Sequence, residues 1–230
     1  MSNTRFSVAL VDADETIFDF YLSEKTALLK TCEAFGIKAD DSDVSVYSVI
    51  NDSLWKELEK GLVTRDELKY ERFRRWFRHL TVEADAAAFD SLYAQNLSEC
   101  SFLLEGAEAF LSNLSEICDI YIVTNGLTKS QRGRMKISPA SKYIRKMYVS
   151  EEIGFAKPDK RYFDFIFADL DIEDRSKAII FGDSLTSDMQ GGKNAGIKTC
   201  LYMRHAKAAD PSLCDFSVSD YDSFISLVRG

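Results

Sequence analysis

The 230-residue sequence is poor in the residues that mark several protein classes. It contains only 3 Pro and 11 Gly and is 46% hydrophobic, which excludes collagen-like chains and argues against long disordered segments. No apolar run approaches the roughly 20 residues that a membrane-spanning helix requires. The 29 basic residues are outnumbered by 37 acidic ones, and the net charge of −8 argues against a nucleic-acid polymer as partner.

Cysteine is scarce and follows no pattern. The chain has five cysteines, an odd number, and no Cys-x-x-Cys pair. We interpret them as free thiols of a reducing compartment. The first residues lead directly into a strand-like segment and show no apolar stretch typical of a signal peptide. We therefore expect a cytoplasmic protein that associates with no membrane.

Short apolar runs rich in Val and Ile recur along the chain. They are Phe6–Val11, Ile117–Val123, Ala178–Phe181 and Ile197–Tyr202, with weaker runs at Lys146–Val149 and Phe216–Val218. Continuous apolar runs of this length are typical of parallel strands covered on both faces. Helix-like segments at 161–170 and 187–195 separate the later runs. This alternation predicts an α/β fold with a doubly wound, Rossmann-like parallel sheet.

The stretch from residue 20 to residue 100 lacks convincing strands. Thr64 and Glu67 form the pattern of a capping box at the start of a helix. Apolar residues recur behind it at helical spacing: Leu68, Phe73, Trp76, Phe77 and Leu80. Further helical stretches are expected at about 23–35, 44–59 and 85–98. We therefore predict a core domain of residues 1–19 and 101–230, interrupted by an α-helical cap domain of residues 20–100.

Polar side chains follow the predicted strands where each strand ends. Asp12 and Asp14 come directly after the first run, Thr124 ends the second, and Asp183 follows a later one. A parallel sheet brings its carboxyl ends to one edge, where open α/β sheets bind ligands. Carboxylate oxygens at this edge suit Mg²⁺.

Other residues near the same edge favour a phosphoryl group as ligand. Thr124, the backbone N–H groups after it and Lys157 offer donors and positive charge, and Pro158 holds Lys157 on a fixed loop. Each residue alone also has an ordinary interpretation: Asp183 as a helix cap, Thr124 as a strand-end hydroxyl, Lys157 as a solvated charge. Together, and in this order, they favour a phosphate-binding metal site.

These segments resemble the four motifs of the haloacid dehalogenase superfamily. The matching strings are Asp12-Ala13-Asp14-Glu15-Thr16, Thr124-Asn125-Gly126, Lys157-Pro158, and Gly182-Asp183 with Asp188. The resemblance covers the whole chain, including the helical cap. The strings at 12–16, 122–126 and 149–158 are also similar to the bacterial pyrimidine 5′-nucleotidase branch, in which Glu15 replaces the superfamily's more usual Gly.

The resemblance implies roles for the carboxylates. Asp12 would attack phosphorus and form an aspartyl-phosphate intermediate. Asp14 would act as general acid and then as general base. Mg²⁺ would be bound by Asp12, the backbone carbonyl of Asp14, and Asp183.

Supporting roles are implied in the same way. Thr124, Asn125 and Lys157 would bind the phosphoryl oxygens and stabilise the charge that spreads over them. Thr16 would orient Asp12 or Asp14 by hydrogen bonding. Asp188 would lie behind the ligands that contact the metal.

The resemblance thus implies a Mg²⁺-dependent phosphatase acting on a small phosphate monoester, with pyrimidine nucleoside 5′-monophosphates favoured. A sugar-phosphate or phosphoglycolate phosphatase on the same scaffold remains an alternative, as does a phosphomutase with the same four motifs. A non-catalytic phosphate-binding protein is an alternative of another class, against which the two intact aspartates argue. We expect a monomer or a homodimer.

Aromatic residues in two places offer stacking surfaces for a base. Trp55, Phe73 and Trp76 lie in the predicted cap, where their spacing is also that of a packed core. Just past the first motif, at the hinge between core and cap, are Phe18, Phe20 and Tyr21, and we expect them to line the site.

Overall fold

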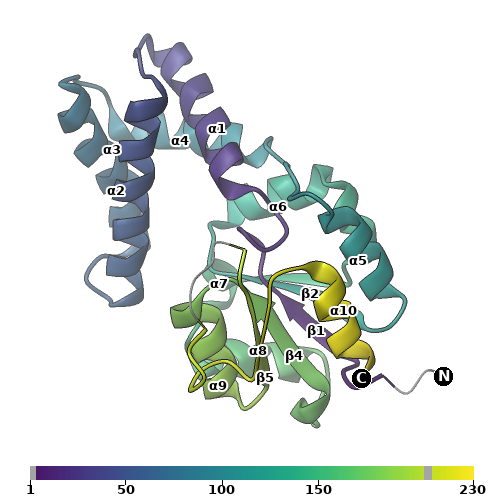
Figure 1. Cartoon of the computed structure of the whole chain (residues 1–230). Coiled ribbons are helices and arrows are strands. Elements are labelled where there is room, and N and C mark those ends of the chain that lie inside the picture. The colour runs from purple at the N-terminus through teal and green to yellow at the C-terminus, as the bar shows by residue number, and fades with distance from the viewer. Residues whose placement is uncertain (1–3, 205–208) are drawn as a thin grey trace. The chain divides into compact units, whose positions relative to one another are not determined.

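The structure, a computed structural model, describes residues 4–204 and 209–230 (Figure 1). Their contacts divide them into two compact units. One unit is formed by the described residues of Met1–Asp19 and Ser101–Gly230, and the other by Phe20–Cys100. The predicted core domain also includes residues 1–3 and 205–208, which lie outside the described residues.

The larger unit is built on a six-stranded parallel sheet with the order β3-β2-β1-β4-β5-β6. The strands are β1 (Val8–Val11), β2 (Asp119–Thr124), β3 (Lys146–Val149), β4 (Ala178–Gly182), β5 (Lys198–Tyr202) and β6 (Phe216–Val218). The predicted doubly wound sheet is confirmed, and both weaker apolar runs are strands. The first strand of the chain lies at the centre, between β2 and β4.

Side chains of the central strand alternate between two hydrophobic cores, one on each face of the sheet. Ala9 and Val11 pack into the core that contains α5 (Ala107–Ser115) and α10 (Tyr221–Arg229). Val8 and Leu10 pack into the other, which contains residues of α8 (Lys160–Asp169) and α9 (Gln190–Ala195). Because every residue of β1 is buried, its sequence is continuously apolar rather than alternating.

Short helices complete the connections between the strands. They are α6 (Thr128–Ile137), η1 (Pro139–Tyr143), α7 (Ser150–Ile153), α8 (Lys160–Asp169), η2 (Arg175–Lys177), η3 (Leu185–Met189) and α9 (Gln190–Ala195). The predicted helices at 161–170 and 187–195 correspond to α8 and to η3 with α9. Of these, η3 is a π-helical turn, a local form often found at functional sites.

The smaller unit is helical, as the sequence predicts for this stretch. Its helices are α1 (Phe20–Phe35), α2 (Asp41–Glu59), α3 (Arg65–Leu80) and α4 (Ala86–Ser98). The capping box at α3 is confirmed: Glu67 N–H donates to Thr64 Oγ1 over 3.2 Å, and Thr64 N–H donates to Glu67 Oε2 over 2.7 Å. No helix among the described residues has the length and apolarity needed to cross a membrane.

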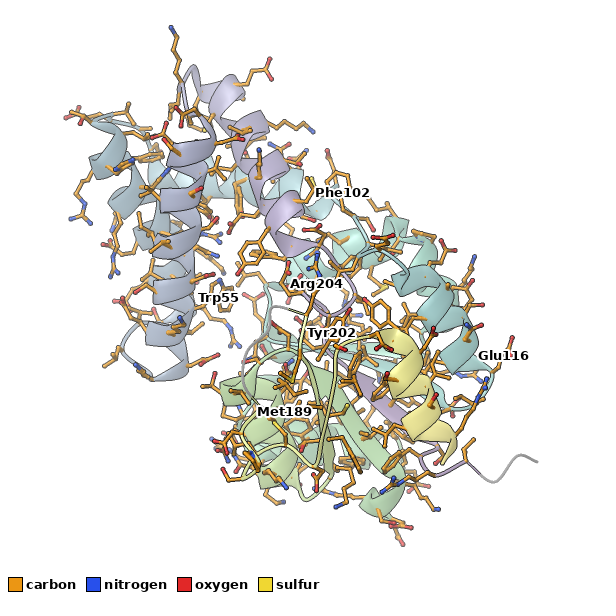
Figure 2. The ribbon with its side chains drawn as sticks, viewed as in Figure 1. Trp55, Phe102, Glu116, Met189, Tyr202 and Arg204 are labelled. Atoms are coloured by element: carbon orange, nitrogen blue, oxygen red, sulfur yellow. The ribbon has the colours of Figure 1, made fainter. Side chains whose placement is uncertain are left out.

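Aromatic side chains fill the core of the helical unit. Phe73 and Trp76 are fully buried there with Phe89 and Tyr93, so their helical spacing reflects packing and not a stacking surface. Trp55 differs, because it is only partly buried on α2 (Figure 2).

Two segments of the larger unit pair where the chain leaves it and returns. Phe18 and Leu103 form an antiparallel bridge, and Asp19 N–H donates to the Phe102 carbonyl over 3.0 Å. Phe18 is fully buried at this bridge. The expectation that its side chain lines an open site is therefore wrong, because the bridge draws it into the core.

Candidate active site

Three adjacent strands bring their ends to one edge of the sheet. Val11 of β1 pairs with Ile122 of β2 on one side and with Phe181 of β4 on the other. Asp12 extends this ladder, since its N–H donates to the Phe181 carbonyl over 2.9 Å. The sheet order reverses around β1, and this reversal is where doubly wound sheets bind ligands.

Three carboxylates meet at that edge. Asp12, Asp183 and Asp188 each offer an oxygen, and these oxygens all lie within 4.8 Å of one another. Asp188 is placed by η3, where the N–H of Ser184 donates to its Oδ2 over 3.1 Å. A Cβ on residue 182 would lie 2.3 Å from the same Oδ2, so only Gly182 leaves room for this carboxylate.

The ammonium group of Lys157 lies between two of these carboxylates. It donates to Asp12 Oδ1 over 2.5 Å, to Asp188 Oδ1 over 2.6 Å and to the Val123 carbonyl over 2.8 Å. All three N–H bonds of the ammonium group are thus used. Its side chain is 1% exposed, so the pairs form away from bulk water.

Burial and charge oppose each other in this cluster. Burial raises the pKa of the Asp12 carboxyl well above its ordinary value, Lys157 lowers it, and Asp188 and Asp183 raise it again. Burial alone would lower the pKa of Lys157, but the carboxylates of Asp12 and Asp188 outweigh it and the pKa rises. Lys157 therefore stays charged and favours the ionised forms of its partners.

Asn125 fixes the loop that carries Lys157. Its side-chain amide donates to the Lys157 carbonyl over 2.8 Å, and its Oδ1 accepts from the Lys157 N–H over 2.9 Å. The Asn125 side chain therefore holds the lysine backbone. Thr124 is buried at the end of β2, and its hydroxyl accepts from the Gly126 N–H over 3.0 Å.

Asp12 and Asp14 have different surroundings although they lie two residues apart. The Asp14 carboxylate is not part of the acidic cluster; it binds Arg134 and Gln131, two side chains of α6. Thr16 Oγ1 lies 3.4 Å from Asp12 Oδ2, within hydrogen-bonding distance. The site residues inferred from the sequence thus form two groups with Asp12 in one and Asp14 in the other.

The sequence predicts that Asp188 lies behind the ligands that contact the metal. It lies in the carboxylate cluster itself and shares Lys157 with Asp12. The Asp14 backbone carbonyl remains the expected metal ligand from that residue.

Sequence reasoning missed three partners of these residues. Arg134 and Gln131 contact Asp14, and Arg204, which follows β5 (Figure 2), pairs with Glu15 over 2.7 Å. Gln131 and Arg134 are three residues apart, so they share one face of the helix that follows Thr124-Asn125-Gly126. This spacing was the signal in the sequence that could have indicated them. No comparable signal links Glu15 to Arg204, because 189 residues separate them.

The donor set of the acidic cluster fits Mg²⁺. Hard carboxylate oxygens are its preferred ligands, and two oxygens bound at about 2.1 Å lie at most about 4.2 Å apart. The three oxygens lie within 4.8 Å of one another, so an approach of at most about 0.6 Å would bring any pair within that limit. Lys157 binds only the Oδ1 atoms of Asp12 and Asp188, and each Oδ2 keeps a lone pair beyond its contact with Thr16 or Ser184.

Comparison with known proteins gives a consistent result. A model of the haloacid dehalogenase-like hydrolases matches residues 6–196. The Bacillus subtilis protein YfnB is 37% identical over 196 residues, covering 85% of this chain and 83% of that protein. A crystal structure of YfnB bound to magnesium superposes with a TM-score of 0.92 at 33% identity, covering 97% of this chain and 99% of that one.

Two further relatives are named for an activity. The pyrimidine 5′-nucleotidase PynA of Streptococcus pneumoniae is 34% identical over 87% of this chain and 85% of its own length. The pyrimidine 5′-nucleotidase YjjG of Escherichia coli is 31% identical over 84% of each chain.

The central position of Lys157 leads to a prediction about stability. Lys157→Met removes the buried cation and leaves Asp12 and Asp188 facing each other. Breaking a buried ion pair from one side typically costs about 3–5 kcal/mol. We expect a loss of that order in the free energy of unfolding, measured by urea denaturation in EDTA. Lys160→Met, which removes an exposed lysine of α8, is the control and should change it by less than about 1 kcal/mol. Equal stability of the two variants would contradict this interpretation.

Proposed function

The chain belongs to the haloacid dehalogenase-like hydrolase family, and we propose that it is a Mg²⁺-dependent phosphatase. It would hydrolyse small phosphate monoesters through an aspartyl-phosphate intermediate. The observation that supports this most is the buried Asp12 at the end of the central strand, paired with Lys157 and adjacent to two further carboxylates.

In the first half-reaction an oxygen of Asp12 attacks phosphorus and the ester P–O bond breaks. Asp14 donates its proton to the departing alkoxide, which leaves as the alcohol. In the second half-reaction water attacks the phosphoryl group and gives its proton to Asp14. The acyl-phosphate bond breaks, Asp12 is regenerated and inorganic phosphate leaves.

Lys157 and Thr124 are suited to the charge that develops on the phosphoryl oxygens. Asn125 holds the backbone of Lys157, so the positive charge of the lysine lies in a fixed place beside Asp12 and would stabilise the developing charge electrostatically. Bound Mg²⁺, held by Asp12, Asp183 and the Asp14 carbonyl, would reduce the repulsion between a carboxylate nucleophile and an anionic ester.

Two arguments favour a phosphate ester over a haloacid as substrate. A halide leaves without a proton, so Asp14 would have no task in dehalogenation, whereas an alkoxide needs one. The relatives PynA and YjjG are named as pyrimidine 5′-nucleotidases, which favours pyrimidine nucleoside monophosphates. A sugar-phosphate or phosphoglycolate phosphatase remains the second candidate.

Replacement of the nucleophile tests the covalent mechanism. Asp12→Asn removes the attacking oxygen and one metal ligand while preserving shape. We expect kcat on an aryl phosphate to fall at least about a thousandfold, with the circular dichroism spectrum unchanged. Retention of more than about a tenth of the wild-type rate would exclude Asp12 as the nucleophile.

Metal removal provides a second test. EDTA should abolish turnover, and Mg²⁺ should restore it, with Mn²⁺ and Co²⁺ as weaker substitutes. Ca²⁺ should inhibit, because it accepts more and longer oxygen contacts and favours a bidentate carboxylate over an attacking one. Independently of activity, Mg²⁺ should raise the melting temperature of the wild type but not of Asp183→Asn. Full activity after exhaustive EDTA treatment would exclude the metal's role.

A substrate panel tests the proposed specificity. We expect kcat/KM for UMP, dUMP and dTMP to exceed that for AMP, glucose 6-phosphate and phosphoglycolate by tenfold or more. Stacking of a base on an aromatic ring contributes about 1–3 kcal/mol, which is enough for the preference over the two esters that lack a base. The preference over AMP rests on the likeness to PynA and YjjG, which are named for pyrimidine nucleotides. A sugar phosphate or phosphoglycolate that wins by tenfold would rule out the nucleotidase while leaving the phosphatase intact.

A further inference from the structure

We propose that Arg134 and Gln131 are positioning residues that hold the Asp14 carboxylate in place for proton transfer. The proposal rests on the function proposed above, in which Asp14 protonates the leaving group. It assigns a task in that reaction to two α6 side chains that lie outside the four motifs.

Each of the two side chains donates a hydrogen bond to one oxygen of the Asp14 carboxylate. Arg134 donates from one terminal nitrogen to Oδ1 over 2.5 Å, and Gln131 donates from Nε2 to Oδ2 over 2.6 Å. With one donor on each oxygen, the carboxylate cannot rotate without breaking a hydrogen bond. Each oxygen keeps a second lone pair, and the Asp14 side chain is 27% exposed, so one side of it stays open to a reacting group.

Arg134 is itself rigidly supported. Its side chain is fully buried, and its guanidinium group lies 4.3 Å from the centre of the Phe18 ring, a cation–π contact. Phe18 belongs to the same loop as Asp14, because its N–H donates to the Ala13 carbonyl and its carbonyl accepts from the Glu15 N–H. The loop that carries Asp14 thus also provides the Phe18 ring that supports Arg134.

Gln131 depends on a second motif. A Cβ on residue 126 would lie 2.3 Å from Gln131 Nε2, so the glycine of Thr124-Asn125-Gly126 leaves the space that this side chain needs. Residues at the end of β2 therefore help to position the carboxylates of both Asp12 and Asp14. Val123 and Asn125 fix the lysine beside Asp12, and Gly126 admits the amide beside Asp14.

A purely structural ion pair would be an alternative reading of the same contacts, and the leaving group distinguishes the two. An alkyl phosphate releases a poor leaving group and requires an acid, whereas 4-nitrophenyl phosphate releases a stable phenolate and does not. Since kcat/KM covers the steps up to the first irreversible phosphoryl transfer, misplacement of Asp14 should reduce it only for the alkyl ester. Damage to the fold or to the Asp12 cluster would reduce both.

The experiment measures kcat/KM of Arg134→Met, Gln131→Leu and Asp14→Asn with UMP, glucose 6-phosphate and 4-nitrophenyl phosphate. The alkyl ester compared is whichever of UMP and glucose 6-phosphate the wild type hydrolyses better. Misplacement of a reacting group by about 1 Å can cost a hundredfold. We expect a loss of about 10- to 100-fold on the alkyl ester and less than about threefold on 4-nitrophenyl phosphate for both α6 variants. Asp14→Asn should show the same selectivity to a greater degree.

Arg132→Met is the matched control, because it removes an exposed arginine of α6 that pairs with Glu152. Arg132→Met should leave kcat/KM unchanged for both the alkyl ester and 4-nitrophenyl phosphate. Equal losses on the two substrates, or none, in Arg134→Met and Gln131→Leu would overturn the proposal. If Arg134→Met fails to fold by circular dichroism, Gln131→Leu decides alone, because it replaces an uncharged side chain by one of similar size. A wild type inactive on all three esters would instead refute the phosphatase, which separates the two failures.

Discussion

A single ammonium group, that of Lys157, makes it possible to bury carboxylates at the end of the central strand. Without a cation, Asp12 and Asp188 would each have to be protonated or exposed, because an unpaired charge away from water is costly. The rest of the site serves this arrangement: Asn125 fixes the lysine backbone, Val123 takes its third N–H, and Gly182 leaves room for Asp188. Segments of β1, β2, β4 and the loop before α8 therefore have to be correct together.

The same loop after β1 carries two carboxylates in two electrostatic surroundings. Asp12 is buried beside a lysine and two aspartates, while Asp14 is partly exposed and bound by an arginine and an amide from α6. Two carboxyl groups placed in different environments are the usual means by which one site provides both a nucleophile and a proton carrier. In an extended strand, side chains two residues apart point to the same face, so the different surroundings of Asp12 and Asp14 depend on the bend at Ala13, where the chain leaves the strand.

The sequence predicted the sheet, the helical stretch and most residues at the strand ends, because continuous apolar runs and the polar residues after them are local signals. Shorter elements gave weaker signals in the sequence. The helix α6 is polar and starts without a side-chain cap, and the residue that caps the start of α5 is a glycine, Gly106. Some contacts between distant segments had no local signal. Arg204 pairs with Glu15 across 189 residues, and the division of Asp12 and Asp14 between two partners depends on how α6 lies against the loop. Phe18 was misjudged for the same reason, since its burial follows from a bridge to Leu103.

The central position of β1 also sets the order in which the protein can assemble during synthesis. This strand emerges first, but its neighbours β2 and β4 begin only at Asp119 and Ala178, and the lysine that binds Asp12 follows it by 145 residues. The helical stretch Phe20–Cys100, which has its own hydrophobic core, leaves the ribosome complete long before that. Domains generally fold as units as they emerge. The helices can therefore pack before β1 has a neighbouring strand to pair with. The carboxylate of Asp12 acquires its cation only after a further 145 residues have been made.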